Sequence, residues 1–170
     1  MLCGGLTVYS PLKRNGCGPG KKVGIVGIGG LGHYAVLFAK AMGATVYAFT
    51  HSARKTPDIL ALGADEVIDT GKEGWEKPLK GQLDLIISTR DTSHGFPMAE
   101  YLSMLWVGSS FICVGLPDEP LPAIPVWAFL NNAAKLGSSH IGSKVEALEM
   151  MQLAADKGIK PWYAQLSSLG

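Results

Sequence analysis

The sequence predicts an α/β fold with a doubly wound parallel sheet of about six strands and helices on both faces. Two observations predict it: short apolar runs alternate with segments of helical spacing, and glycine or proline punctuates most of the changes between them. Strands joined through helices form right-handed crossovers, so the sheet is expected to be mostly parallel and covered on both faces. The 170 residues suit one domain.

The first two strand–helix pairs are the clearest. Residues 22–26 form a short apolar run after a Gly-Pro-Gly turn, which predicts a strand. Residues 31–42 carry apolar side chains at helical spacing and are followed by glycine, which suits a helix end. Residues 45–50 are apolar, β-branched or aromatic and predict the second strand. Ser52 is placed to cap a helix over residues 53–62, which glycine again ends.

The rest of the chain continues this alternation. Residues 71–82 carry glycine, proline and charged residues, so they are expected to form a loop or an irregular crossover. Helices are expected at residues 96–105 and 144–157. Residues 121–127 are broken by proline, which favours an extended segment or an edge strand. The remaining strands are expected at residues 66–69, 83–88, 110–114 and 135–139.

Composition and charge exclude several classes of function. The 15 Lys and Arg nearly balance the 14 Asp and Glu, so no basic field favours nucleic acid or an anionic membrane surface. No apolar run approaches the roughly 20 residues of a membrane span, and the N-terminus lacks the features of a signal peptide. The 3 cysteines are widely spaced and match neither a disulfide framework nor a Cys-x-x-Cys metal site. We therefore expect a cytoplasmic protein with reduced thiols.

Residues 27–32, Gly-Ile-Gly-Gly-Leu-Gly, lie between the first predicted strand and the first predicted helix. In this position the G-x-G-x-x-G pattern is typical of dinucleotide binding: the first glycine permits a tight turn, the second lets a diphosphate approach, and the third lets the helix pack closely. The alternative is a glycine-rich turn with no ligand. The pattern predicts a Rossmann-type dinucleotide-binding domain over residues 1–170. The expected diphosphate-binding residues are Gly27, Gly29, Gly30, Leu31 and Gly32.

The end of the second predicted strand indicates which dinucleotide binds. An NAD site usually has Asp or Glu there to hold the ribose 2′-hydroxyl. This chain instead has Thr50-His51-Ser52-Ala53-Arg54-Lys55, which offers hydroxyls and cations but no carboxylate. These groups suit a 2′-phosphate, so NADP is favoured. The alternative is an ordinary helix N-terminus with exposed basic residues. The candidate residues for the 2′-phosphate are Thr50, His51, Ser52 and Lys55.

With these motifs in place, the chain resembles the zinc-containing medium-chain alcohol dehydrogenases, specifically the NADP-dependent cinnamyl alcohol dehydrogenase group. The resemblance covers nearly all 170 residues. It rests on Cys-Gly-Gly-Leu-Thr-Val-Tyr-Ser-Pro-Leu at residues 3–12, on residues 18–33 around the glycine pattern, and on Gly-Ala-Asp-Glu-Val-Ile-Asp at residues 63–69. The first two blocks are specific to this group, and the third is shared more widely in the superfamily.

The resemblance implies a role for each matching position. Cys3 matches the cysteine that supplies the last protein ligand to the catalytic zinc, and Thr7 matches the residue beside the nicotinamide ring. Thr50, His51 and Lys55 match the positions that hold the 2′-phosphate, although the family often has Ser and Arg at the first two. Further matches follow later strands: Thr89 and Arg90 near the adenosine ribose, and Gly115, Leu116, Ser139, His140 and Ile141 near the nicotinamide carboxamide.

The family also has a GroES-like catalytic domain that carries the other zinc ligands, and none of it is present in these residues. We therefore expect an excised or truncated domain. The intact parent would use zinc and NADP(H) to interconvert primary alcohols and aldehydes. Catalytic zinc needs three protein ligands, so Cys3 alone cannot hold it. By itself the chain is expected to bind NADP, to hold no zinc and to catalyse no reaction.

Two other functions are compatible with a Rossmann fold. A non-catalytic nucleotide-sensing domain is the main alternative, although residues 3–12 resemble half of a zinc site, for which a sensor has no use. A methyltransferase normally needs an acid near position 50, where this chain has Thr50. The resemblance further implies a homodimer that pairs the sixth strands edge to edge. The apolar region within residues 121–141 is the candidate interface.

Overall fold

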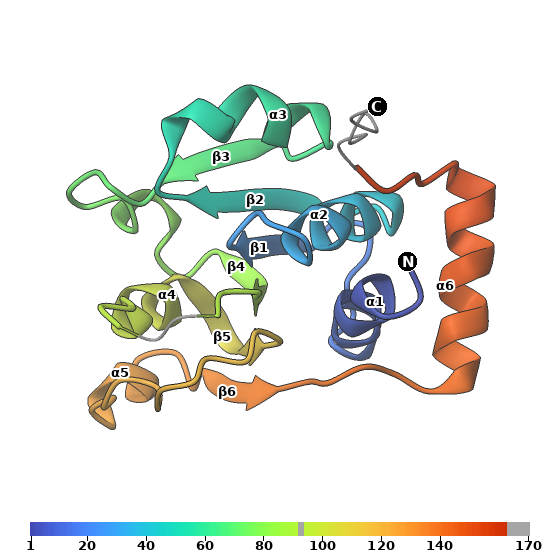
Figure 1. Ribbon diagram of the computed structural model, residues 1–170. Coiled ribbons are helices and arrows are strands. Elements are labelled where there is room, and N and C mark those ends of the chain that lie inside the picture. The colour runs from blue at the N-terminus through green and yellow to red at the C-terminus, as the bar shows by residue number, and fades with distance from the viewer. Residues whose placement is uncertain (92–93, 163–170) are drawn as a thin grey trace.

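The computed structural model describes residues 1–91 and 94–162. At its centre lies one six-stranded sheet with the order β3-β2-β1-β4-β5-β6, and every adjacent pair is parallel (Figure 1). The predicted doubly wound α/β fold is therefore confirmed. The strands are β1 (Lys22–Val26), β2 (Thr45–Thr50), β3 (Glu66–Asp69), β4 (Leu83–Ser88), β5 (Leu105–Cys113) and β6 (Lys135–Ser138).

Helices cover both faces of the sheet, as expected. Alternate residues of β2 enter different cores: Val46 and Ala48 pack with α1, α2 and α6, whereas Tyr47 and Phe49 pack with α4. Both sets are apolar because both faces are buried, which explains the continuous apolar runs of the sequence. The helices are α1 (Gly4–Arg14), α2 (Gly32–Ala41), α3 (Thr56–Ala61), α4 (Met98–Met104), α5 (Trp127–Leu130) and α6 (Lys144–Lys157), with short 3-10 helices η1 (Ala53–Lys55) and η2 (Lys77–Leu79).

The structure corrects the prediction for the helix after β2. Ser52 makes no side-chain cap hydrogen bond, and its own N–H donates to Oγ1 of Thr50 (3.1 Å). The expected single helix is divided into η1 and α3. Pro57 lies in the first turn of α3, where it is tolerated, and it cannot continue a helix that began earlier. The sequence therefore starts the α-helix at Thr56 rather than at residue 53.

The short helix α5 (Trp127–Leu130) was not predicted, and two further elements differ from expectation. The helix α1 was not predicted, because Gly4, Gly5 and Pro11 obscure a helical pattern. The strand β5 begins at Leu105, five residues before the expected start, and its pairing with β4 is irregular at this end. Gly108, with a positive φ of 75°, interrupts the strand before residue 110, so the sequence pattern did not extend the strand to Leu105.

A polar network joins α1 to α6. Oγ of Ser143 accepts from the N–H of Glu146 (3.2 Å), and Oε2 of Glu146 accepts from the N–H of Ser143 (2.7 Å), which forms a capping box. Arg14 donates two hydrogen bonds to the same carboxylate, each of 2.7 Å. The Arg14 guanidinium, aided by the Ser143 N–H, lowers the pKa of Glu146 to about 2. This contact holds α1 against the helix that closes the fold.

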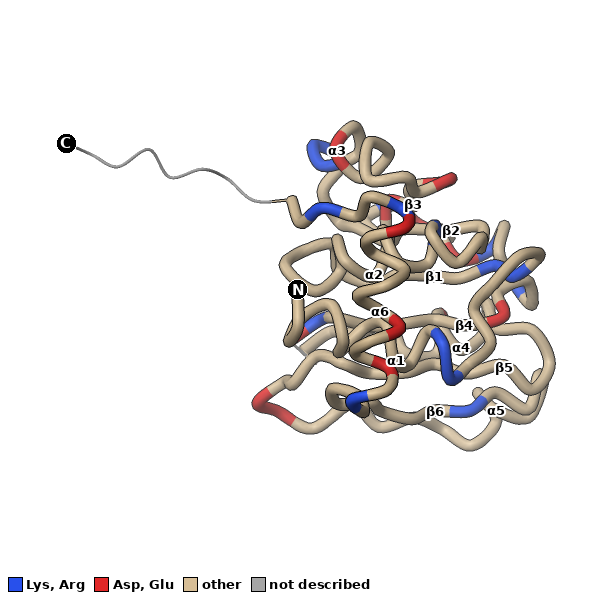
Figure 2. The backbone as a smooth tube through the Cα atoms, turned by 90° about the vertical axis from the view of Figure 1, so that its right-hand side faces the viewer, with Lys and Arg blue, Asp and Glu red and all other residues tan. Residues whose placement is uncertain are grey.

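Charges of both signs are scattered over the elements (Figure 2). In the described part of the chain, no helix combines the length and the apolar character that a membrane crossing requires. In the sheet, β1 lies between β2 and β4, so the crossovers leave β1 in opposite directions. Such a switch point opens a crevice at the carboxyl ends of the strands, where ligands of this fold class bind.

Candidate functional site

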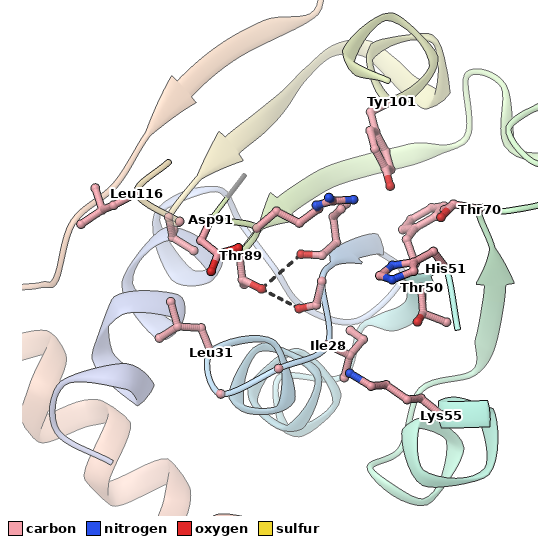
Figure 3. Close-up of a pocket in the computed structure, with 18 residues that line it drawn as sticks. Ile28, Leu31, Thr50, His51, Lys55, Thr70, Thr89, Asp91, Tyr101 and Leu116 are labelled. Atoms are coloured by element: carbon pink, nitrogen blue, oxygen red, sulfur yellow. Dashed lines mark hydrogen bonds between the residues drawn. The ribbon is translucent and has the colours of Figure 1, made fainter. Parts of the chain in front are cut away.

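A cavity of about 650 Å³ lies at this switch point. It runs across the ends of β1, β2, β4 and β5, with Leu116 at one end and Lys55 and Thr70 at the other (Figure 3). The size and position suit an elongated ligand laid across the sheet edge. The predicted site residues that line it are Gly27, Gly29, Gly30, Leu31, Thr50, His51, Lys55, Thr89, Arg90, Gly115 and Leu116.

The glycine loop forms the floor of the cavity. Gly27 has a positive φ of 85°, which permits the tight turn from β1 into the loop. Oγ1 of Thr89 donates to the carbonyl oxygens of Gly27 (2.5 Å) and Val26 (3.2 Å), so the end of β4 holds the loop in place. No atom lies within 4 Å of the point where a Cβ on Gly29 or Gly30 would stand. The loop therefore offers bare backbone to the cavity at the N-terminus of α2, which favours anions.

The end of β2 supplies polar and basic groups. Thr50 is buried, whereas His51 and Lys55 are exposed. Figure 3 shows the Lys55 side chain extending from η1 toward Ile28 in the glycine loop. Among the described residues that line the cavity, Asp91 is the one carboxylate, and it lies beside Thr89, away from Lys55. The β2 end of the cavity thus has the donors and the positive charge that a phosphate monoester needs.

Several predicted residues do not line this cavity. Gly32 packs behind the loop. Ser52 is not among the lining residues, although the preceding residue His51 is. Thr7 is buried in α1, where its Oγ1 donates to the carbonyl of Cys3 (2.9 Å). The three residues after β6 do not line the cavity either; they are Ser139, His140 and Ile141. For all of these positions a cofactor contact stays a prediction.

The cavity also contains residues that sequence reasoning missed. Thr70 and Asp91 come shortly after the ends of β3 and β4. Ligand sites of this fold class lie at the carboxyl ends of the strands, so this position was a sequence signal for both residues. Tyr101 reaches the cavity from α4, and no sequence spacing marks it. The other unpredicted lining residues are Val26, Ile28, Phe49 and Val114.

Cys3 is the candidate metal ligand of the chain. The residue is exposed at the start of α1. Within residues 1–91 and 94–162, no group of three His, Cys, Asp or Glu side chains is arranged to hold a metal ion. A catalytic zinc requires three protein ligands. The described residues therefore do not fit a zinc ion by themselves.

Comparison with known families gives one match over most of the chain. Residues 30–156 match the family model described as zinc-binding dehydrogenase. The NADP-dependent alcohol dehydrogenase 6 of Saccharomyces cerevisiae is 38% identical over 167 residues, covering 98% of this chain and 46% of the yeast protein. The chain thus spans about half the length of the curated relatives it matches.

Solved structures agree with this match. The cinnamyl alcohol dehydrogenase SbCAD4 of Sorghum bicolor superposes with a TM-score of 0.87 at 35% identity, covering 93% of this chain and 44% of that one. The protein CAD from Helicobacter pylori, solved in complex with NADP(H), gives a TM-score of 0.82 at 37% identity, covering 95% of this chain and 45% of that one. Both likenesses cover nearly the whole chain.

Proposed function

The chain belongs to the zinc-binding dehydrogenase family, and we propose on this premise that residues 1–170 are the NADP(H)-binding domain of an alcohol dehydrogenase. One observation carries the proposal: a single cavity joins a bare glycine loop at the start of α2 to the basic, carboxylate-free end of β2. The first feature suits a diphosphate and the second suits a 2′-phosphate. The NADP(H) complex of the Helicobacter pylori relative supports the same cofactor.

The proposed cofactor lies across the strand ends. The backbone at Gly29, Gly30 and Leu31 would bind the diphosphate, and Lys55 would face the 2′-phosphate across the loop. The remaining assignments follow the family resemblance: Thr50, His51 and Ser52 at the 2′-phosphate, Thr89 and Arg90 at the adenosine ribose, and Thr7, Gly115, Leu116, Ser139, His140 and Ile141 at the nicotinamide end.

Titration of the chain with NADPH, followed by the nucleotide's fluorescence, tests this proposal. Saturable binding of one NADPH per chain is expected, and Gly29→Ala is expected to weaken it because the methyl group would occupy the diphosphate position. No saturable binding, with the chain folded by circular dichroism, would refute the proposed function.

We further propose that the complete enzyme interconverts primary alcohols and aldehydes. Bound NADP(H) supplies or accepts the hydride, and this domain orients the nicotinamide. Cys3 would contribute one zinc ligand, and the other ligands would come from outside the described residues. Because of this, the chain alone is expected to retain no zinc after dialysis and to reduce no aldehyde with NADPH. One tightly bound zinc per chain, or turnover, would contradict this assignment.

A homodimer is proposed through the β6 edge. β6 ends the sheet, so within residues 1–91 and 94–162 one side of its backbone has no neighbouring strand. Large apolar side chains before it are exposed: Val126 by 73%, Trp127 by 63% and Leu130 by 72%. Pairing two such edges would bury this surface in a two-fold interface.

We also propose a cytoplasmic location, with neither nucleic acid nor membrane as a partner, because the 15 basic and 14 acidic residues nearly balance.

A further inference from the structure

The hydroxyl of Tyr101 is an unused polar group in the wall of the cavity. Tyr101 is only 2% exposed, yet no hydrogen bond joins its hydroxyl to the described part of the chain. Figure 3 shows the hydroxyl pointing from α4 into the cavity. Because the hydroxyl opens onto the cavity, a ligand there can hydrogen-bond it without breaking a contact within the described residues.

The ring of Tyr101 is held in place on several sides. Its centroid lies 4.9 Å from that of Trp75, 5.4 Å from that of Phe49 and 5.1 Å from that of Phe96, which stacks on it. Such packing fixes the direction of the hydroxyl before any ligand arrives. Burial raises the pKa of Tyr101, so the group stays a neutral hydroxyl at physiological pH. It can both donate and accept a hydrogen bond.

The surroundings indicate which part of a ligand meets this hydroxyl. Tyr101 and Lys55 lie on opposite sides of the same end of the cavity, with His51 between them (Figure 3). The Lys55 ammonium is therefore on the far side of the cavity from Tyr101. The cavity is lined by two aromatic rings, Phe49 and Tyr101, and by Arg90, whose guanidinium carbon lies 5.7 Å from the centroid of Phe96 behind the wall. Aromatic rings and a flat guanidinium suit a planar base with a polar edge.

We propose that Tyr101 hydrogen-bonds the polar edge of the adenine base of the dinucleotide. This assignment rests on the proposed function and adds a residue that selects the base. An amino-purine edge presents a donor beside an acceptor, and the hydroxyl can serve either. Arg90 has donors only, so it cannot accept from an exocyclic amino group. Tyr101 can do so, and its ring packing fixes the direction of the hydroxyl.

The test compares Tyr101→Phe with the unmodified chain. Removing one neutral hydrogen bond is expected to weaken the affinities for NADPH, NADH and adenosine 2′,5′-bisphosphate alike, by roughly three- to tenfold. The ratio of the NADPH and NADH constants is expected to stay unchanged. The midpoint of thermal unfolding is also expected to stay unchanged, because the ring remains and the lost hydroxyl had no partner within the described residues.

Other outcomes would overturn the assignment. Unchanged affinities for all three nucleotides would show that the hydroxyl binds nothing. A loss confined to the two ligands with a 2′-phosphate would place Tyr101 at the phosphate instead of the base. Lys55→Ala is the matched control, since it is expected to weaken NADPH and the bisphosphate but not NADH. An unmodified chain that binds no NADPH would refute the proposed function itself and this assignment with it.

Discussion

Gly32 packs directly against the carbonyl oxygen of Gly27: a Cβ on Gly32 would lie 2.0 Å from that oxygen. Any side chain at position 32 would therefore push α2 away from the end of β1. Gly29, three residues earlier, has open space at the corresponding point. The loop thus contains two kinds of glycine, one needed for packing and one that leaves room for a ligand.

These two glycines are expected to respond differently to alanine. Gly32→Ala is expected to lower the free energy of unfolding by about 1–3 kcal/mol, the usual cost of overpacking. Gly29→Ala is expected to leave that free energy nearly unchanged but to weaken the affinity for NADPH by about tenfold or more. Urea unfolding and NADPH titration of both variants measure these effects. A stable Gly32→Ala variant, or NADPH binding unaffected by Gly29→Ala, would contradict this account of the loop.

The contact between Glu146 and Arg14 predicts a dependence of stability on pH. The folded pKa of Glu146, about 2, lies below the ordinary value of 4.5. A carboxylate with a depressed pKa stabilises the fold above its unfolded pKa, and this contribution is lost as pH falls from about 4.5 toward 2. Asp65 and Asp84 also have lowered pKa values, so the variant Glu146→Gln isolates the effect.

Urea midpoints at pH 6 and pH 3 measure this dependence. At pH 6 the urea midpoint of the unmodified chain is expected to lie clearly above that of Glu146→Gln. At pH 3 the difference between the two midpoints is expected to shrink. Gln also forms capping boxes, so the variant removes mainly the charge facing Arg14. A difference that is equal at the two pH values would mean that the charge of Glu146 does not stabilise the fold.

The proposed dimer predicts that a charge at its centre separates the chains. Trp127→Glu is expected to convert a dimer into a monomer in sedimentation velocity at micromolar concentration, because a carboxylate would be buried in the interface. Leu60→Glu is the matched control: Leu60 is also exposed, by 46%, but lies in α3 at the opposite edge of the sheet. A monomeric unmodified chain would refute the dimer.

The sequence predicted the sheet well because buried parallel strands are continuous apolar runs, and β1, β2, β3 and β4 match their expected ranges. It failed where the local signal was weak. Helix α1 is buried along eight of its residues, so it shows no clear polar face, and Pro11 lies inside it. In β5, Gly108 has a positive φ of 75° and interrupts the apolar run before residue 110.

The site was predictable in part for a related reason. Residues that follow strand ends, such as Thr50 and Thr89, were found because parallel strands bring their carboxyl ends together. Tyr101 was not found, because its contribution depends on how α4 packs against Phe49 and Phe96. Side chains that reach a site from a helix on the sheet face require tertiary structure for their identification.

The central claim is that the end of β2 binds a 2′-phosphate, and the dissociation constants of NADPH and NADH test it most directly. The unmodified chain is expected to bind NADPH more tightly. Lys55→Ala is expected to weaken the binding free energy of NADPH by roughly 1–3 kcal/mol, the range for a charge-assisted hydrogen bond. The binding of NADH is expected to stay unchanged. Lys72→Ala, an exposed lysine that does not line the cavity, is expected to change neither. Equal affinity for the two nucleotides, or a preference for NADH, would contradict the assignment.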